Sequence, residues 1–192
     1  MEMDNELKAI LNPDTTVLLI WDVQKRLVAN IFNAESFLDK TKRVISSAKE
    51  NNVQVIFSKI TPLSGKFESP VRKYFFKNMK SYVNQVPNGL DLEIEPTGED
   101  IVIPKNTASM FIGTNFEMLL RNAGITTIIL TGIATEFGVE STARDAYNRG
   151  FFPVIITDAV SSSDQDAHNR SLENIKKMAI LLTTDELISA WK

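Results

Sequence analysis

Six short runs of apolar residues, rich in β-branched side chains, recur along the chain and are separated by longer amphipathic segments. Runs of this length that are apolar throughout are typical of strands buried on both faces of a parallel sheet. In the segments between them, apolar residues return every three or four positions, which predicts helices with one face against a sheet. The predicted strands are residues 15–21, 53–57, 100–104, 126–130, 153–157 and 179–182.

Polar residues and glycines predict where the intervening helices begin and end. Thr114 with Glu117, and Thr183 with Glu186, match the T-x-x-E capping box, in which the two side chains satisfy free backbone N–H groups. A glycine just after the last turn is likewise typical of a helix end. The predicted starts are Ser36, Thr114, Asp164 or Asp166, and Thr183, and the predicted ends include Gly124, Gly150 and Met178.

The alternation of strands and helices predicts an α/β fold, with a six-stranded, mostly parallel, doubly wound sheet in a three-layer α/β/α arrangement. We expect one domain that covers residues 1–192. In the commonest order of such sheets, 3-2-1-4-5-6, the first and fourth strands are neighbours, and ligands bind beyond their carboxyl ends. Asp22 and Gly132 then face each other across this crevice.

Composition and charge narrow the class of protein. A formal charge of −3 disfavours a nucleic acid or an anionic membrane as partner. No apolar run approaches the ~20 residues that a membrane span needs. The acidic N-terminus lacks the basic start and apolar core of a signal peptide, so we expect a cytoplasmic protein.

The absence of cysteine and the single histidine exclude several kinds of chemistry. Without cysteine, disulfides, thiolate metal sites and thiol nucleophiles are impossible. His168 lies in a polar run and is expected at the surface or in a helix cap, so Ser109 and Ser141 lack a histidine partner for serine hydrolase chemistry. We expect no metal, and the lack of a Gly-rich nucleotide motif predicts no cofactor.

A basic and aromatic segment interrupts the regular pattern between residues 59 and 100. It is interpreted either as a lid that covers an anionic ligand or as an amphipathic helix with a solvated cationic face. Clusters of proline and glycine at 87–89 and 96–98 indicate loops, so the segment is an elaborated connection. Its cations are Lys66, Arg72, Lys73, Lys77 and Lys80, interleaved with Phe67, Tyr74, Phe75 and Phe76.

Three ordered motifs follow predicted strands. The first is Asp22-x-Gln24. On pattern alone, its acid is interpreted equally as an active-site group or as a cap for backbone amides. The second is K-x-x-x-S-x-F-x-G-T from Lys105, and the third is T-G-I-A-T-E-F-G-V-E-S-T-A-R-D-A from Thr131, with Asp158 and Ala159 further on. Together they resemble the isochorismatase-like hydrolase family over residues 17–187.

The resemblance implies a set of site residues. Asp22 and Lys105 become an acid/base and a charge stabiliser, and Gly138 stands where most members have a nucleophilic cysteine. A cis peptide between Ile133 and Ala134 is implied. The predicted catalytic residues are Asp22 and Lys105, and the predicted substrate-binding residues are Gly138, Ile133, Ala134 and Phe137. Asp145 and Asp158 also match the family and are interpreted as structural.

The resemblance implies a hydrolase for a small molecule, assembled as a homo-oligomer of two or more chains. The favoured reaction is hydrolysis of a vinyl ether such as isochorismate, with release of pyruvate and with Gly138 making room for substrate. A silent family member that binds a metabolite or an assembly partner, and an amidase that activates water, are the alternatives. An acid next to Lys105 has a lowered pKa, so the vinyl ether mechanism requires burial to outweigh the ammonium.

Overall fold

The computed structural model describes residues 5–77 and 86–192, which are organised around one six-stranded sheet. Its strand order is β3-β2-β1-β4-β5-β6, and every neighbouring pair is parallel. The strands are β1 (Thr16–Trp21), β2 (Gln54–Ile60), β3 (Ile101–Lys105), β4 (Thr127–Ile133), β5 (Phe152–Ser161) and β6 (Ile180–Leu182). The predicted fold and strand order are confirmed.

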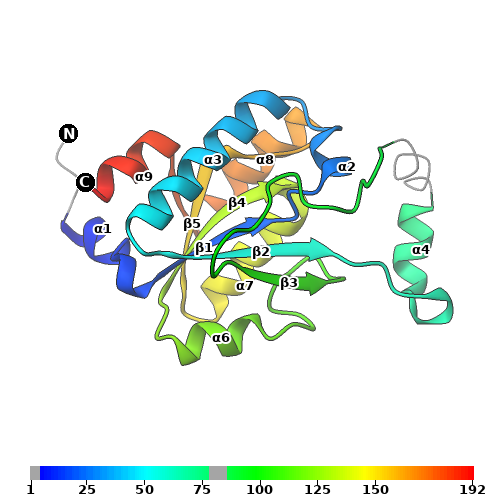
Figure 1. Ribbon diagram of the computed structural model, residues 1–192, viewed down its shortest axis with the longest axis horizontal. Coiled ribbons are helices and arrows are strands. Elements are labelled where there is room, and N and C mark those ends of the chain that lie inside the picture. Colours follow the sequence, from blue (N-terminus) through cyan, green and yellow to red (C-terminus); the bar gives the residue numbers. More distant parts are fainter. Residues whose placement is uncertain (1–4, 78–85) are drawn as a thin grey trace.

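Two apolar cores lie on the two faces of the sheet. The helices α3 (Ala34–Glu50) and α9 (Thr184–Ala190) cover one face, whereas α6 (Phe116–Asn122), α7 (Glu140–Asn148) and α8 (Gln165–Ile175) pack into the core on the other face. Figure 1 shows α3 and α9 on the opposite side of the strands from α6 and α7. Side chains of β1 alternate between the cores, as period-2 strand geometry requires, and Trp21 belongs to the core of α6 and α7.

Shorter helical elements complete the described structure. They are α1 (Asn5–Ile10), α2 (Lys25–Val28), α4 (Pro70–Phe76), the 3₁₀ turns Pro13–Thr15 and Gly65–Phe67, and a π-turn at Thr135–Val139. The helix α4 stands apart from the sheet, on the side toward which β2 and β3 point (Figure 1). Among the described residues, no helix has the length and apolar character to span a membrane.

Helix starts are less well predicted than strands. The helix α3 begins at Ala34, two residues before Ser36, and its N-cap residue is Asn33. The capping box predicted at Thr114 is wrong. The Thr114 hydroxyl accepts from Phe116 N and donates to the Met110 carbonyl, while Glu117 pairs with Arg121 and Arg149. The box at Thr183 is present.

The predicted ends of two other elements also need correction. Asp164 caps α8 by accepting a hydrogen bond from Ala167 N, but the helix ends at Ile175 and not at Met178. The strand β5 continues past Asp158 to Ser161, with a register shift against β4 between Leu130 and Gly132. In the basic and aromatic segment, Lys80 and the side chains of Phe75 and Phe76 lie outside the described part.

Candidate active site

Asp22 and Lys105 meet at the carboxyl ends of two strands that are not neighbours. Asp22 follows the last residue of β1, Lys105 is the last residue of β3, and β2 runs between them. The Lys105 Nζ atom lies 2.5 Å from Asp22 Oδ2, and each side chain is only 3% exposed. The two residues that the resemblance singles out therefore form a buried ion pair.

Ser58, on the intervening strand β2, holds the aspartate in place. Its hydroxyl donates to Asp22 Oδ1 at 2.6 Å and accepts a hydrogen bond from Asp22 N at 2.9 Å. Asp22 has a positive φ of 45°, a conformation that is uncommon for residues other than glycine. Sequence reasoning missed Ser58, whose position inside an apolar strand was its only signal.

Burial raises the pKa of the Asp22 carboxyl above its ordinary value, although the nearby charge and hydrogen bond of Lys105 and the hydrogen bond of Ser58 oppose this shift. Burial likewise lowers the pKa of the Lys105 ammonium, against the attraction of Asp22. Both directions favour the neutral form of each group. The condition that burial outweighs the ammonium is thus met in this pair.

The motif that follows Lys105 fixes the direction of the lysine. Its Nζ atom also donates to the Thr107 carbonyl at 3.1 Å, and the Thr107 hydroxyl in turn donates to the carbonyl of Ser109. The Ser109 hydroxyl accepts from Phe111 N. Ser109 therefore takes part in a local turn that positions Lys105, and the structure gives it no nucleophilic role.

Gln24 has a comparable local function at the end of β2. Its side-chain oxygen accepts from Ile60 N at 3.0 Å, and its amide nitrogen donates to Leu90 O at 2.6 Å. Gln24 is fully buried. The glutamine of the D-x-Q motif thus ties the chain after β1 to the end of the neighbouring strand.

Trp21 fills the space beside Gly138. A Cβ atom added to Gly138 would lie 1.7 Å from Trp21 Nε1 and 1.9 Å from Cε2, so no side chain fits there. The same indole lies under the Lys105 ammonium, 3.9 Å from the ring centroid, in a cation–π contact. The interpretation that Gly138 makes room for substrate is wrong, because the Trp21 indole occupies the volume that a side chain at position 138 would take.

The signature after β4 has the geometry that the resemblance implied. The peptide between Ile133 and Ala134 is cis. Gly132 pairs with Trp21 in the parallel ladder, and a Cβ at Gly132 would lie 2.0 Å from the Trp21 carbonyl oxygen, so only glycine fits. The Ile133 side chain is buried in the core, whereas Phe137 is 60% exposed. The substrate-binding roles of these residues stay predictions.

His168 is not at the surface, which corrects the prediction. It is 7% exposed, and its Nδ1 atom lies 2.8 Å from the Thr135 hydroxyl oxygen. The Thr135 hydroxyl donates to the Ser161 carbonyl. Burial lowers the pKa of His168 and favours the neutral ring. Ser171 donates to the carbonyl of Thr135 as well. The histidine supports the π-turn of the signature.

The two remaining acids of the motifs have structural partners. Asp145 pairs with Arg149 at the end of α7, with 2.9 Å between Oδ1 and Nη1. Asp158 Oδ1 accepts hydrogen bonds from the backbone and the hydroxyl of Thr184 at the start of α9, each at 2.8 Å. These contacts agree with the structural interpretation of both acids.

Two arginines also lie within electrostatic reach of the pair. Burial lowers the pKa of Arg26, attraction by Asp22 opposes this shift, and repulsion by Arg72 adds to it. Burial lowers the pKa of Lys105 as well, and repulsion by Arg72 adds to that shift. Arg72 donates to the backbone carbonyl of Asn106, the residue after Lys105. Arg26 was missed at the sequence level because it sits in a four-residue helix with no recognisable motif.

The fold and the motifs together define a hydrolase domain of known type. The isochorismatase domain matches residues 16–186, and the chain belongs to the isochorismatase family. The uncharacterized isochorismatase family protein YwoC of Bacillus subtilis is 29% identical over 184 residues, which covers 92% of this chain and 94% of that protein.

Other relatives match over shorter stretches. YecD of Escherichia coli O157:H7, also an uncharacterized isochorismatase family protein, is 43% identical over 95 residues, 49% of this chain and 50% of that protein. The ureidoacrylate amidohydrolase RutB of Pseudomonas savastanoi is 40% identical over 85 residues, 44% of this chain but only 35% of that protein.

Solved structures agree with the fold. A cysteine hydrolase from Pseudomonas syringae pv. phaseolicola superposes with a TM-score of 0.82 at 22% identity, covering 94% of this chain and 93% of that chain. An isochorismatase family protein from Burkholderia thailandensis gives a TM-score of 0.72 at 28% identity, with coverage of 93% and 96%.

Proposed function

We propose that this protein hydrolyses a small anionic substrate without a covalent thiol intermediate, with Asp22 as acid/base and Lys105 as charge stabiliser. The observation that carries the proposal is the buried contact between the two side chains, together with burial that raises the pKa of Asp22. A vinyl ether such as isochorismate is the substrate class that best fits an acid in this state.

The proposed reaction begins with proton transfer from the Asp22 carboxyl to the terminal methylene carbon of the vinyl ether. An oxocarbenium-like cation forms, water adds to it, and the hemiketal collapses to pyruvate and an alcohol. Asp22 regains a proton from the added water. No side chain needs to act as nucleophile, which is compatible with glycine at position 138.

Lys105 contributes through its charge. Its ammonium binds a carboxylate of the substrate, and when Asp22 gives up its proton the same ammonium stabilises the carboxylate that remains. Arg72, in the basic segment, adds a second positive charge near Lys105. We also expect Phe137, Ile133, Ala134 and the backbone of Gly138 to border the substrate.

Two observations favour alternative functions. The similarity to a ureidoacrylate amidohydrolase supports an amidase in which water is activated between Asp22 and Lys105. The second alternative, a catalytically silent member that binds a metabolite or an assembly partner, is favoured by the indole that fills the volume beside Gly138. The three functions differ in their product: pyruvate, ammonia or none.

The test is pyruvate release from isochorismate by the wild type and by Asp22→Asn. We expect turnover by the wild type and a loss of at least about 100-fold in the variant, since general acid catalysis contributes on this order. Asp39→Asn, an exposed acid on α3, is the matched control and should keep full activity. No pyruvate from the wild type sinks this substrate, and ammonia from an amide panel then supports the amidase.

We further propose that the protein acts in the cytoplasm on a small molecule and assembles as a homo-oligomer of two or more chains. The family resemblance supports the assembly. Exposed apolar residues on α4 support it as well, since Val71 is 64% and Tyr74 is 67% exposed.

A further inference from the structure

Arg26 is a partly buried cation that forms no ion pair with the residues that the structure describes. It lies on α2, and its backbone N–H donates to the Gly89 carbonyl at 3.1 Å. Its Nε atom is buried and has no acceptor within hydrogen-bond distance in the described part of the chain. A buried donor without an acceptor costs free energy, so such a group in a native fold calls for an explanation.

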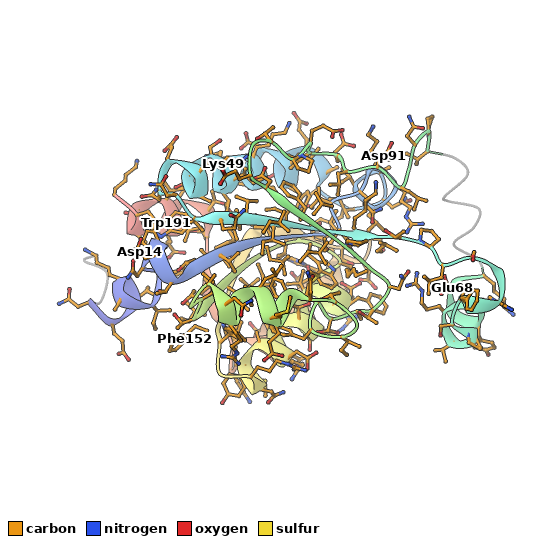
Figure 2. The ribbon with its side chains drawn as sticks, turned by 60° about the horizontal axis from the view of Figure 1, so that its bottom comes forward. Asp14, Lys49, Glu68, Asp91, Phe152 and Trp191 are labelled. Carbon is orange, nitrogen blue, oxygen red and sulfur yellow. The ribbon has the colours of Figure 1, made fainter. Side chains whose placement is uncertain are left out.

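The acids near Arg26 and Arg72 already pair with other groups. Asp91, whose backbone carbonyl accepts from Lys25 N, pairs through Oδ1 with Lys59 at 3.5 Å. Asp22 Oδ2 contacts Lys105, and Asp22 Oδ1 accepts from Ser58. Glu68 pairs with Arg72 at 3.3 Å, on the segment that projects from the body of the protein (Figure 2). Residues 78–85, outside the described part, contain neither aspartate nor glutamate.

Within the group of Arg26, Arg72 and Lys105, the cations outnumber the acids that pair with them. Asp22 pairs with Lys105 and Glu68 pairs with Arg72, which leaves Arg26 as the third cation of this group. Burial lowers the pKa of Arg26 and repulsion from Arg72 adds to this, against the attraction of Asp22. Proton loss does not relieve a guanidinium at neutral pH. An anion from outside the chain would supply both the missing charge and the missing acceptor.

We propose that Arg26 binds a carboxylate group of the ligand beside the Asp22–Lys105 pair, with Arg72 as a second cation. The planar guanidinium matches a carboxylate in a bidentate pair, which also fixes the direction of the ligand. The inference rests on the proposed function for the statement that this carboxylate belongs to the substrate. Binding itself does not depend on turnover, so the two proposals fail separately.

The test is a titration of the wild type with acetate, followed through the indole N–H signals in ¹H–¹⁵N spectra. The chain has two tryptophans, and Trp191→Phe assigns the signal of Trp21, which lies against Lys105. We expect acetate to shift the Trp21 signal in a saturable manner. In Arg26→Gln, the apparent Kd should rise at least about 10-fold, as expected for the loss of a charged hydrogen-bonded pair.

Matched controls separate this effect from general loss of charge. Lys25→Gln removes a neighbouring cation on α2 and should change the apparent Kd less than about twofold, whereas uncharged acetamide should leave the Trp21 signal in place. Asp22→Asn should still bind acetate. A wild type that shows no saturable shift, or an Arg26→Gln protein that binds acetate as tightly as the wild type, overturns the proposal.

Inorganic phosphate provides a further arm of the same experiment. A wild type that binds phosphate more tightly than acetate, through Arg26, contradicts the assignment of a carboxylate ligand. Acetate binding that depends on Arg26 in a protein with no hydrolytic activity keeps the subsite. The absence of hydrolytic activity in that protein would overturn the proposed reaction, and the function would then be binding of a metabolite.

Discussion

Gly138 and Trp21 form an interlocked pair, and each explains the other. The indole takes the volume into which any side chain at position 138 would project. Restoring a cysteine at this position therefore does not restore a nucleophile by itself. The site departs from a thiol mechanism through two residues that lie more than a hundred positions apart in the sequence.

Gly138→Cys should destabilise the fold by about 1–3 kcal/mol, the usual cost of forcing extra atoms into a packed core. Trp21→Leu combined with Gly138→Cys should recover part of this loss and present a thiol that reacts with iodoacetamide. Because the natural chain has no cysteine, mass spectrometry reports this one thiol. Urea unfolding measures the stability of each variant.

Ser141→Cys, in the following helix α7, is the control for adding a thiol without a clash with the indole. Its free energy of unfolding should lie within about 0.5 kcal/mol of the wild-type value, as for most substitutions outside special contacts. If Gly138→Cys is equally stable, the indole moves aside at little cost, and the interlocked packing is wrong.

Lys105→Met should expose the cost of burying an unpaired carboxylate. Removing one partner of a buried pair typically costs about 3–5 kcal/mol. Burial already raises the pKa of Asp22, and the loss of Lys105 raises it further. The folded state then binds a proton that the unfolded state has released, so the variant loses stability as the pH rises through this raised pKa.

The measurement is urea unfolding of Lys105→Met at pH 5 and pH 8. The loss of stability should be at least about 1 kcal/mol smaller at pH 5, where Asp22 is neutral more often. Lys176→Met, which removes an exposed pair with Glu173, should cost less than about 1 kcal/mol at both pH values. An equal loss at both pH values for Lys105→Met argues against a raised pKa.

At the scale of elements, the site depends on three adjacent parallel strands whose carboxyl ends lie at the same edge of the sheet. The strand β1 leads into Asp22 and β3 ends on Lys105, and these two side chains meet directly. The strand β2 between them contributes Ser58, which holds Asp22 alone. Loss of the Ser58 hydrogen bond therefore affects both the position and the protonation of Asp22.

Ser58→Ala removes a hydrogen bond that lowers the pKa of Asp22. The carboxyl of the variant should hold its proton to higher pH, so the fall of kcat at high pH should move upward. The rate below that limb should drop on the order of 10-fold, because Asp22 is less well positioned. The pH profile of kcat checks both effects on the substrate that the wild type hydrolyses.

Ser46→Ala, at an exposed position on α3, should leave the same profile unchanged. A purely structural role for Ser58 would lower the rate and leave the high-pH limb in place. That result would limit Ser58 to support of the backbone at Asp22.

The strands and their order are predictable from the sequence because a strand buried on both faces is apolar throughout, as in β1. The start of α6 is not predictable in this way. The Glu117 side chain forms ion pairs with Arg121, one turn further along α6, and with Arg149 at the end of α7, and so does not cap the helix. The polar neighbours of His168 in the sequence predicted a surface position, but in the fold the residue is buried against Thr135 of the signature.

The candidate site shows the same division. Asp22 and Lys105 are found through motifs at strand ends, since a parallel sheet brings those ends to one edge. Ser58, Trp21 and Arg26 act through contacts between elements distant in the chain, which no local pattern encodes. The sequence alone does not indicate which distant side chains come into contact in the folded protein.

At the scale of the whole molecule, α4 is a short helix that stands away from the sheet (Figure 1). Helices of this length are not stable alone in water and need tertiary packing. Contacts of Arg72 with Asn106 and of Lys73 with Gly65 hold it to nearby loops. Its exposed apolar residues, among them Val71, have no comparable cover from the sheet, and a second copy of the chain would supply it.

Val71→Asp should therefore weaken the expected homo-oligomer, because a charge in an apolar interface must lose its hydration. We expect the wild type to elute as a dimer or larger species in size-exclusion chromatography with light scattering, and the variant to shift toward monomer at micromolar concentration. Met118→Asp, at another exposed apolar position, on α6, is the control and should not change the mass. A monomeric wild type contradicts the assembly, and a variant that keeps the wild-type mass moves the interface away from α4.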